Sequence, residues 1–191
     1  MKVSAIIPAA GNSERMGTCK TLLTFHNGTT FADHLCEFFT GNGCSPVILI
    51  VNAAFAANRP VPDNVLQVIN SRVHLGRFHS IQLGIQHVPE DVACFIQNVD
   101  NPYTEPGLLS LLINAIEPGN YAVPVYKGKA GHPILLGSNI VRTIRGRHGD
   151  ADFREILRQF TRIEIPHPSD QILWNINTPA DYKEFLRREQ E

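Results

Sequence analysis

The stretch that decides the fold is VSAIIPAAGNSERMGTCK, residues 3–20 of the 191-residue chain. Its first six residues form a short apolar run, as in a buried strand, and the polar turn that follows holds two glycines, Arg15 and Lys20. Such a turn can surround a polyphosphate with backbone N–H groups while fixed cations neutralise its charge. A strand that enters a loop of this composition therefore predicts a nucleotide site.

The spacing within this loop excludes the two commonest phosphate-binding motifs. Glycines at positions 11 and 17 do not make the G-x-G-x-x-G of dinucleotide-binding folds. In a P-loop the lysine directly follows the second glycine, whereas Lys20 comes three residues after Gly17. The ingredients of phosphate binding are present in another arrangement, and the alternative is an ordinary connection with solvated cations.

Composition narrows the class of protein. The length favours one domain over residues 1–191. A net charge of −1, from 17 Lys and Arg against 18 Asp and Glu, provides no general field for nucleic acid. The apolar runs are too short to cross a bilayer and no secretory signal is visible, so we expect a cytoplasmic monomer or homodimer without membrane contact. The four cysteines have no C-x-x-C pair and are expected to be reduced; a reactive role for Cys19 stays open.

Apolar runs alternate with segments of helical periodicity, which is the pattern of a parallel α/β sheet. The expected strands are residues 3–8, 46–51, 65–69, 92–99, 121–126, 133–136, 162–165 and 172–176. The expected helices are residues 30–39, 80–88, 106–116, 138–144 and 151–160, with a last helix that begins at Thr178-Pro179. The prediction is a three-layer α/β/α domain with a mostly parallel, doubly wound sheet, whose ligands bind at the carboxyl ends of the strands.

A carboxylate follows the fourth predicted strand, in Asn98-Val-Asp-Asn-Pro102. Asp100 would face the glycine loop across the same edge of the sheet, where a carboxylate can hold Mg²⁺. The alternative is that Asp100 only caps the turn before Pro102.

Two amides occur in the segment Trp174-Asn-Ile-Asn-Thr-Pro179. Asn175 and Asn177 alternate on the strand expected there, so both side chains would point to one face. An amide oxygen can complete a magnesium shell that already holds a carboxylate and phosphates. The plainer interpretation is the end of a strand followed by a helix cap.

Together these loops resemble the MobA-like NTP transferase family of molybdenum cofactor cytidylyltransferases and guanylyltransferases, which is related to sugar- and polyol-phosphate nucleotidyltransferases. The opening pattern (L/P)-A-A-G-x-S-x-R-(M/F)-G-x-x-K of that family is matched from Pro8 to Lys20 at every fixed position. Five further matches follow in order: G-x-x-x-S-(I/L)-x-x-G at Gly76–Gly84, D-x-P at Asp100–Pro102, G-H-P at Gly131–Pro133, G-D at Gly149-Asp150 with Arg154, and (D/N)-x-(D/N)-T-P-x-D at Asn175–Asp181.

The resemblance implies a nucleotide-diphospho-sugar transferase-like, Rossmann-like fold and a magnesium-dependent transfer of a nucleoside monophosphate to a phosphorylated acceptor, with release of pyrophosphate. CTP is the favoured donor and GTP is possible; molybdopterin is the first expectation for the acceptor. The expected site residues are Arg15, Lys20 and Asp100 for catalysis, Ala9, Ala10, Gly11, Asn12, Ser13, Gly76 and Ser80 for the nucleotide, His132 and Asp150 for the acceptor, and Asp100 and Asn177 for Mg²⁺. A helix N-cap for Ser80 and a structural turn histidine for His132 remain as alternatives.

This chain departs from the cytidylyltransferase pattern in three places. Asn175 and Asn177 replace the usual aspartates, a choice closer to the guanylyltransferases. The G-D segment loses a glycine and gains Phe153, and Arg77-Phe78-His79 replaces small residues before Ser80. These changes leave two alternatives open: the same chemistry on a sugar phosphate, polyol phosphate or other small acceptor, and a nucleotide-binding protein without turnover.

Overall fold

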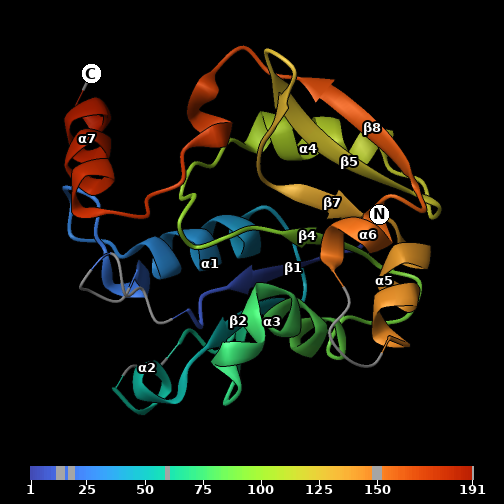
Figure 1. The fold of residues 1–191 in the computed structure, drawn as a ribbon, viewed down its shortest axis with the longest axis horizontal. Coiled ribbons are helices and arrows are strands. Elements are labelled where there is room, and N and C mark those ends of the chain that lie inside the picture. The colour runs from blue at the N-terminus through green and yellow to red at the C-terminus, as the bar shows by residue number, and fades with distance from the viewer. Residues whose placement is uncertain (12–15, 17–19, 59–60, 148–151, 191) are drawn as a thin grey trace.

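A computed structural model describes residues 1–11, 16, 20–58, 61–147 and 152–190 of the chain. The described strands form one sheet in the order β3-β2-β1-β4-β7-β5-β6, with β8 paired to β5 (Figure 1). Their bounds are β1 Val3–Pro8, β2 Val47–Val51, β3 Val65–Ile69, β4 Ala93–Ile96, β5 Asn120–Tyr126, β6 Lys129–Ala130, β7 Ile134–Leu136 and β8 Thr161–Pro166.

The sheet is mostly parallel, as the sequence predicts. Strand β1 pairs in parallel with both β2 and β4, β2 pairs in parallel with β3, and β8 pairs in parallel with β5. The exceptions are β7, which runs antiparallel to β4 and β5, and the short β6, which runs antiparallel to β5. The carboxyl ends of β1, β2, β3 and β4 therefore meet at one edge.

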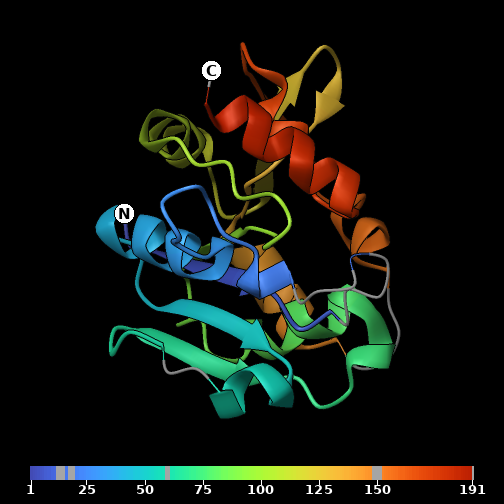
Figure 2. The same cartoon turned by 90° about the vertical axis from the view of Figure 1, so that its left-hand side faces the viewer.

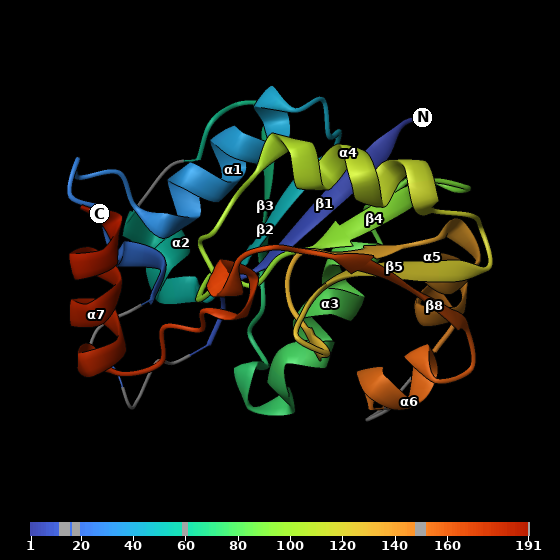
Figure 3. The ribbon, with the colours of Figure 1, turned by 90° about the horizontal axis from the view of Figure 1, so that it is seen from above.

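Helices cover both faces of the sheet and make three layers (Figure 3). One face packs against α1 (Phe31–Gly41) and α4 (Pro106–Ala115). The other packs against α3 (Gly76–Ile85), α5 (Ser138–Arg145) and α6 (Phe153–Leu157). The short α2 (Ala53–Asn58) follows β2. No helix among the described residues is long and apolar enough to cross a membrane.

The central strand β1 supplies both apolar layers. Val3, Ala5 and Ile7 join the core beneath α1 and α4, whereas Ile6 joins the core beneath α3 and α5. Successive side chains of a strand point to opposite faces, so a strand covered on both sides is apolar throughout. This is why the sequence run before the glycine loop is continuous rather than alternating.

Helix α3 lies unusually close to β1. A Cβ atom added at Gly84 would lie 2.8 Å from Cγ2 of Ile6, closer than any real contact of that kind. Glycine at this position lets the helix approach the strand, and the start of α3 is thereby held beside the loop that follows β1.

Two helices have bounds in the structure that differ by several residues from those predicted from the sequence. The helix expected at residues 80–88 begins at Gly76, where φ is +80° and the chain turns out of the short 3-10 helix η2 (Val73–Leu75). Ser80 therefore lies within the helix and does not open it. Helix α6 ends at Leu157, not residue 160, because the chain then turns into β8.

The strand expected at residues 172–176 is wrong. Residues Asp170–Leu173 form a 3-10 helix, η3, and beyond it Ile176 N donates at 2.8 Å to Asp100 O, in the loop after β4. Strand β4 already has β1 and β7 on its two sides, so it offers this segment no free edge.

The last helix, α7 (Pro179–Glu189), packs against the chain that follows Lys20 (Figures 1 and 2). It begins with the expected N-cap at Thr178, which forms a capping box with Asp181. The ring of Phe185 meets that of Phe31 edge to face at 5.1 Å between centroids, and the Tyr182 hydroxyl donates to Thr24 O at 2.7 Å.

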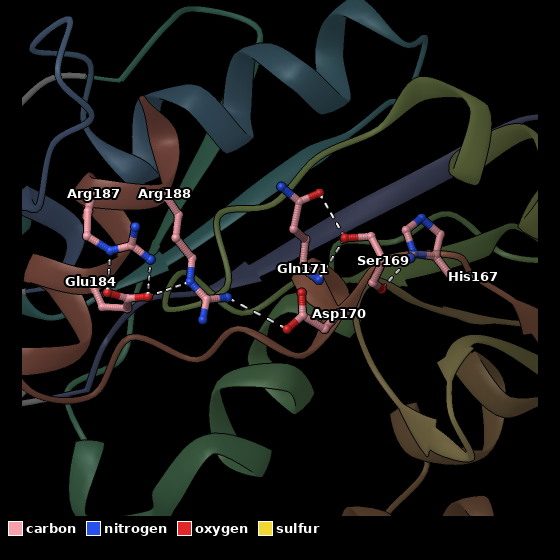
Figure 4. Close-up of polar contacts among 7 residues, drawn as sticks. All are labelled: His167, Ser169, Asp170, Gln171, Glu184, Arg187 and Arg188. Carbon is pink, nitrogen blue, oxygen red and sulfur yellow. Dashed lines mark hydrogen bonds and ion pairs between the residues drawn. The ribbon is translucent and has the colours of Figure 1, made fainter. Parts of the chain in front are cut away.

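Arg188 links α7 back to η3 (Figure 4). Its guanidinium lies 2.6 Å from Glu184 and 3.7 Å from Asp170, and it lies over the Trp174 ring at 4.9 Å from the centroid. The segment between η3 and α7, which carries Asn177, is thus held from both ends.

Candidate nucleotide and metal site

A cavity of about 650 Å³ opens at the carboxyl ends of β1 and β4, beside the start of α3. Its lining includes eight residues expected at the site from sequence: Ala9, Ala10, Gly11, Lys20, Gly76, Ser80, Asp100 and Asn177. The volume falls within the range of small-molecule sites. The position agrees with the expectation that ligands of a doubly wound sheet bind at the carboxyl ends of its strands.

Lys20 joins the two residues predicted to bind metal. It begins the 3-10 helix η1 (Lys20–Leu22), and its Nζ donates to Asp100 Oδ2 at 2.9 Å and to Asn177 Oδ1 at 2.7 Å. The Lys20 and Asp100 side chains are 16% and 23% exposed, so the pair is largely shielded from solvent. Three segments far apart in the chain converge on one ammonium group.

Backbone hydrogen bonds fix this convergence. Val99 N donates to Pro8 O at 3.4 Å, which holds the loop after β4 against the loop after β1. Ile176 N donates to Asp100 O at 2.8 Å, which places Asn177 next to Asp100. The side-chain Nδ2 of Asn101, a fully buried residue, also donates to Ile172 O at 3.0 Å and anchors η3 to the same loop.

The donor set fits a hard divalent cation. Asp100 Oδ1 is buried and has no hydrogen-bond partner. Asn177 Oδ1 and Asp100 Oδ2 both accept hydrogen bonds from the Lys20 ammonium. Carboxylate and amide oxygens are ligands that Mg²⁺ accepts, with phosphate oxygens and water completing its shell. Among the described residues no group of three or more His, Cys, Asp or Glu could hold a metal ion. A metal here would therefore rely on nucleotide oxygens as well as on the protein.

The two asparagines do not share a face. Asn177 lines the main cavity, whereas Asn175 lines a smaller one beside α7, and its Nδ2 donates to Leu173 O at 2.9 Å. The alternation expected of a strand does not apply because this segment is not a strand.

Ser80 lies on the cavity wall and is 4% exposed. Its Oγ accepts a hydrogen bond from Asn70 Nδ2 at 3.0 Å, and Asn70 Oδ1 in turn accepts from Arg72 N at 2.8 Å. The hydroxyl is therefore oriented by a residue at the end of β3, and it does not cap the helix.

His132 stands behind the cavity wall. Its Nε2 lies 3.0 Å from Asn98 Nδ2, and its Nδ1 is buried without a partner. Burial lowers the pKa of His132 to about 4, and the charge of Arg77 acts in the same direction, whereas Asp100 and the Ile96 carbonyl oppose it. The imidazole is therefore neutral at physiological pH. It does not line the cavity itself but contacts Asn98, which does.

Three polar residues of the lining were not predicted as site residues. Arg77, in the first turn of α3, and His74, in η2, add basic side chains. Asn98 is 6% exposed, and its Oδ1 has no hydrogen-bond partner. The departure Arg77-Phe78-His79 was the sequence signal for the extra cation. Nothing in the sequence distinguished Asn98 from an ordinary loop residue.

Some expected residues lie outside the described part of the chain. They are Asn12, Ser13, Arg15, Cys19 and Asp150. Their predicted roles stay predictions.

Comparison with known proteins agrees with the fold. Residues 5–164 match the MobA-like NTP transferase domain. The chain is 24% identical over 188 residues to the molybdenum cofactor cytidylyltransferase of Escherichia coli K12, which covers 94% of this chain and 93% of that protein. It is 25% identical over 195 residues to a probable molybdenum cofactor guanylyltransferase of Mycolicibacterium paratuberculosis, with 96% and 94% covered. The structure of Rv0371c from Mycobacterium tuberculosis in complex with manganese matches with a TM-score of 0.76 at 19% identity, over 98% of this chain and 99% of that one.

The α/β fold is that of nucleotidyltransferases, and the protein belongs to this class of enzyme. The chain is a member of the MobA-like NTP transferase family, which uses a nucleoside triphosphate and a small acceptor.

Proposed function

We propose that the protein transfers a nucleoside monophosphate, CMP by preference, from a nucleoside triphosphate to a phosphorylated acceptor of the molybdopterin class. The observation that carries the proposal is the contact of Lys20 with both Asp100 and Asn177 on a cavity walled by the loop after β1. A carboxylate, an amide oxygen and a cation at one edge form a site suited to a metal-bound triphosphate.

The reaction needs no protein nucleophile. An oxygen of the acceptor phosphate attacks the α-phosphorus, the new P–O bond forms in line, and the bond to the bridging oxygen of the β-phosphate breaks as pyrophosphate leaves. Catalysis then consists of positioning and of compensating the negative charge that builds on the phosphates.

The residues predicted for the site have the following proposed roles in that scheme. The backbone N–H groups of the loop that begins at Ala9 and Ala10 contact the base and phosphates, and Lys20 and Arg15 neutralise the triphosphate. Asp100 and Asn177 would hold a divalent cation, with Mg²⁺ as the proposed ion; when bound, it supplies charge neutralisation and polarises the phosphate oxygens. The manganese complex of the structurally similar Rv0371c supports a divalent ion.

The choice of base rests on the wall near α3. Ser80, oriented by Asn70, is proposed to hydrogen-bond the base or ribose next to Gly76. Similar relatives carry both cytidylyl- and guanylyltransferase names, so CTP and GTP are the two donors to compare.

The acceptor is proposed to lie near Asn98, which lines the cavity and whose Nδ2 lies 3.0 Å from Nε2 of the neutral His132 behind it. Asp150 keeps a proposed acceptor role on the sequence resemblance alone. Arg77, which lines the same cavity, adds a cation for a phosphate of either substrate.

The test is pyrophosphate release with each of the four triphosphates, Mg²⁺, and molybdopterin, a polyol phosphate or a sugar phosphate as acceptor. The proposal expects release with CTP above the other triphosphates, only with molybdopterin, and loss of release on adding a chelator. Release with GTP alone would overturn the donor, and release with another acceptor would overturn the acceptor. Nucleotide binding without release for every acceptor would contradict the transfer reaction.

A further inference from the structure

The position between Asp100 and Asn177 is filled by the chain itself. The Lys20 ammonium lies 2.9 Å from Asp100 Oδ2 and 2.7 Å from Asn177 Oδ1, so it contacts both of the side chains proposed to hold the metal. The ammonium neutralises the carboxylate and uses the amide oxygen as a second acceptor. A divalent cation cannot take both oxygens while the ammonium stays there, because the two positive charges would repel at contact distance.

Hydrogen bonds hold the backbone of the loop that carries Asp100. Asp100 is held through its own carbonyl by Ile176 N, and Asn101 is fully buried and bonded to Ile172 O. Lys20 has a flexible four-carbon stem that can redirect its charge. The ammonium is therefore a group that can change place while the backbone that carries Asp100 is held.

We infer that Lys20 closes the metal position in the free protein, so that the divalent cation enters only together with the nucleotide. The inference rests on the proposed function, because it needs a triphosphate to draw the lysine away. A bound triphosphate offers Lys20 several anionic oxygens at the loop after β1, and Asp100 and Asn177 are then released for the cation that the triphosphate carries. Each charge keeps an opposite partner throughout the exchange.

This arrangement deepens the proposed function by setting the order of binding. The free protein does not take up free metal ions at this site, and the productive species is the metal–nucleotide complex. Protein without substrate thus keeps its carboxylate paired, and the metal's shell is completed only when phosphate oxygens are present.

The test measures Mn²⁺ binding to the nucleotide-free protein by electron paramagnetic resonance and calorimetry. The inference expects Lys20→Met to bind Mn²⁺ at least about tenfold more tightly than wild type, since the competing charge is gone and both oxygens are free. The double variant Lys20→Met with Asp100→Asn should lose that gain, which separates this site from histidines elsewhere on the surface. Lys129→Met, an exposed lysine on β6, is the matched control for lost positive charge and should bind Mn²⁺ as wild type does.

Equal Mn²⁺ affinity of wild type and Lys20→Met, whether both bind or neither does, would overturn the inference. Lys20→Gln, which keeps a polar chain without the charge, repeats the measurement if the methionine variant fails to fold. Because these measurements use no nucleotide, they are independent of pyrophosphate release. A protein that binds metal as expected but never releases pyrophosphate refutes the proposed function and leaves the closed metal position standing.

Discussion

Replacing Asp100 with Asn removes one charge from the site and changes little else. The variant keeps the size of the side chain and an oxygen that can accept from Lys20, but it loses the carboxylate proposed to hold the cation. Removal of one charge-stabilising group from an active site costs on the order of 10²–10³ in turnover, or about 2.7–4 kcal/mol of transition-state stabilisation. We expect a loss of this size in pyrophosphate release.

The same change should cost far less in stability. A hydrogen bond to a charged group contributes about 1.5–3 kcal/mol, and the Asn oxygen retains part of it. The Lys20 and Asp100 side chains are also 16% and 23% exposed, which lets water compensate the ammonium. We expect the free energy of unfolding to fall by about 1 kcal/mol, a small part of the roughly 5–15 kcal/mol of a typical domain.

The assay combines pyrophosphate release under saturating Mg²⁺ and nucleotide with urea unfolding. Asp91→Asn is the matched control, because Asp91 is also paired with an arginine, Arg142, but lies 74% exposed and away from the cavity. The control should keep wild-type turnover. A folded Asp100→Asn protein with turnover within about threefold of wild type would refute the assignment of this carboxylate.

Three further changes test other parts of the account. Lys20→Ala should lower turnover on the order of 10²–10³ without unfolding the protein, by pyrophosphate release and circular dichroism; near-normal turnover would contradict its role. Burial lowers the pKa of His132 to about 4. The folded state therefore becomes less stable as the pH falls from about 6.5 towards 4, because the unfolded chain takes up the proton first. His132→Gln should remove up to roughly 3 kcal/mol of that pH-dependent loss, measured by urea unfolding at pH 7.5 and 4.5. The same change in the free energy of unfolding between the two pH values in wild type and variant would count against the buried neutral His132. Gly84→Ala should destabilise by about 1–3 kcal/mol against Ile6, whereas Gly41→Ala, with open space around it, should not; equal melting temperatures would contradict the close packing.

The sequence predicted the elements whose apolar pattern is decided by burial alone. Strands β1 and β3 have the predicted bounds, because each is a short apolar run between clear breaks. The mostly parallel sheet followed from the alternation of such runs with helical segments. The antiparallel β7 was predicted as a strand, but its direction depends on a pairing that no local pattern encodes.

The wrong strand at residues 172–176 shows where local pattern fails. Its alternation of Ile and polar residues suits a strand, but both edges of β4 are occupied and Ser169 accepts from Gln171 N at the start of η3. The start of α3 was misplaced for a similar reason, since the positive φ of Gly76 cannot be inferred from the residue type alone.

The candidate site was predictable as a set of residues and not as a geometry. Lys20, Asp100 and Asn177 each had an ordinary alternative, and only folding brings the Lys20 ammonium within 3 Å of the other two side chains. The neutral imidazole of His132 and the unpaired oxygen of Asn98 depend on burial among distant segments, which spacing along the chain does not reveal.

The most direct test of the central claim is a crystal structure with Mn²⁺ and a non-hydrolysable CTP analogue, read by the anomalous signal of manganese. The account predicts a manganese peak bonded to Asp100 and Asn177, the triphosphate along the loop that begins at Ala9, and Lys20 moved onto its phosphates. A nucleotide bound in the cavity with manganese elsewhere, and Lys20 still on Asp100, would contradict it.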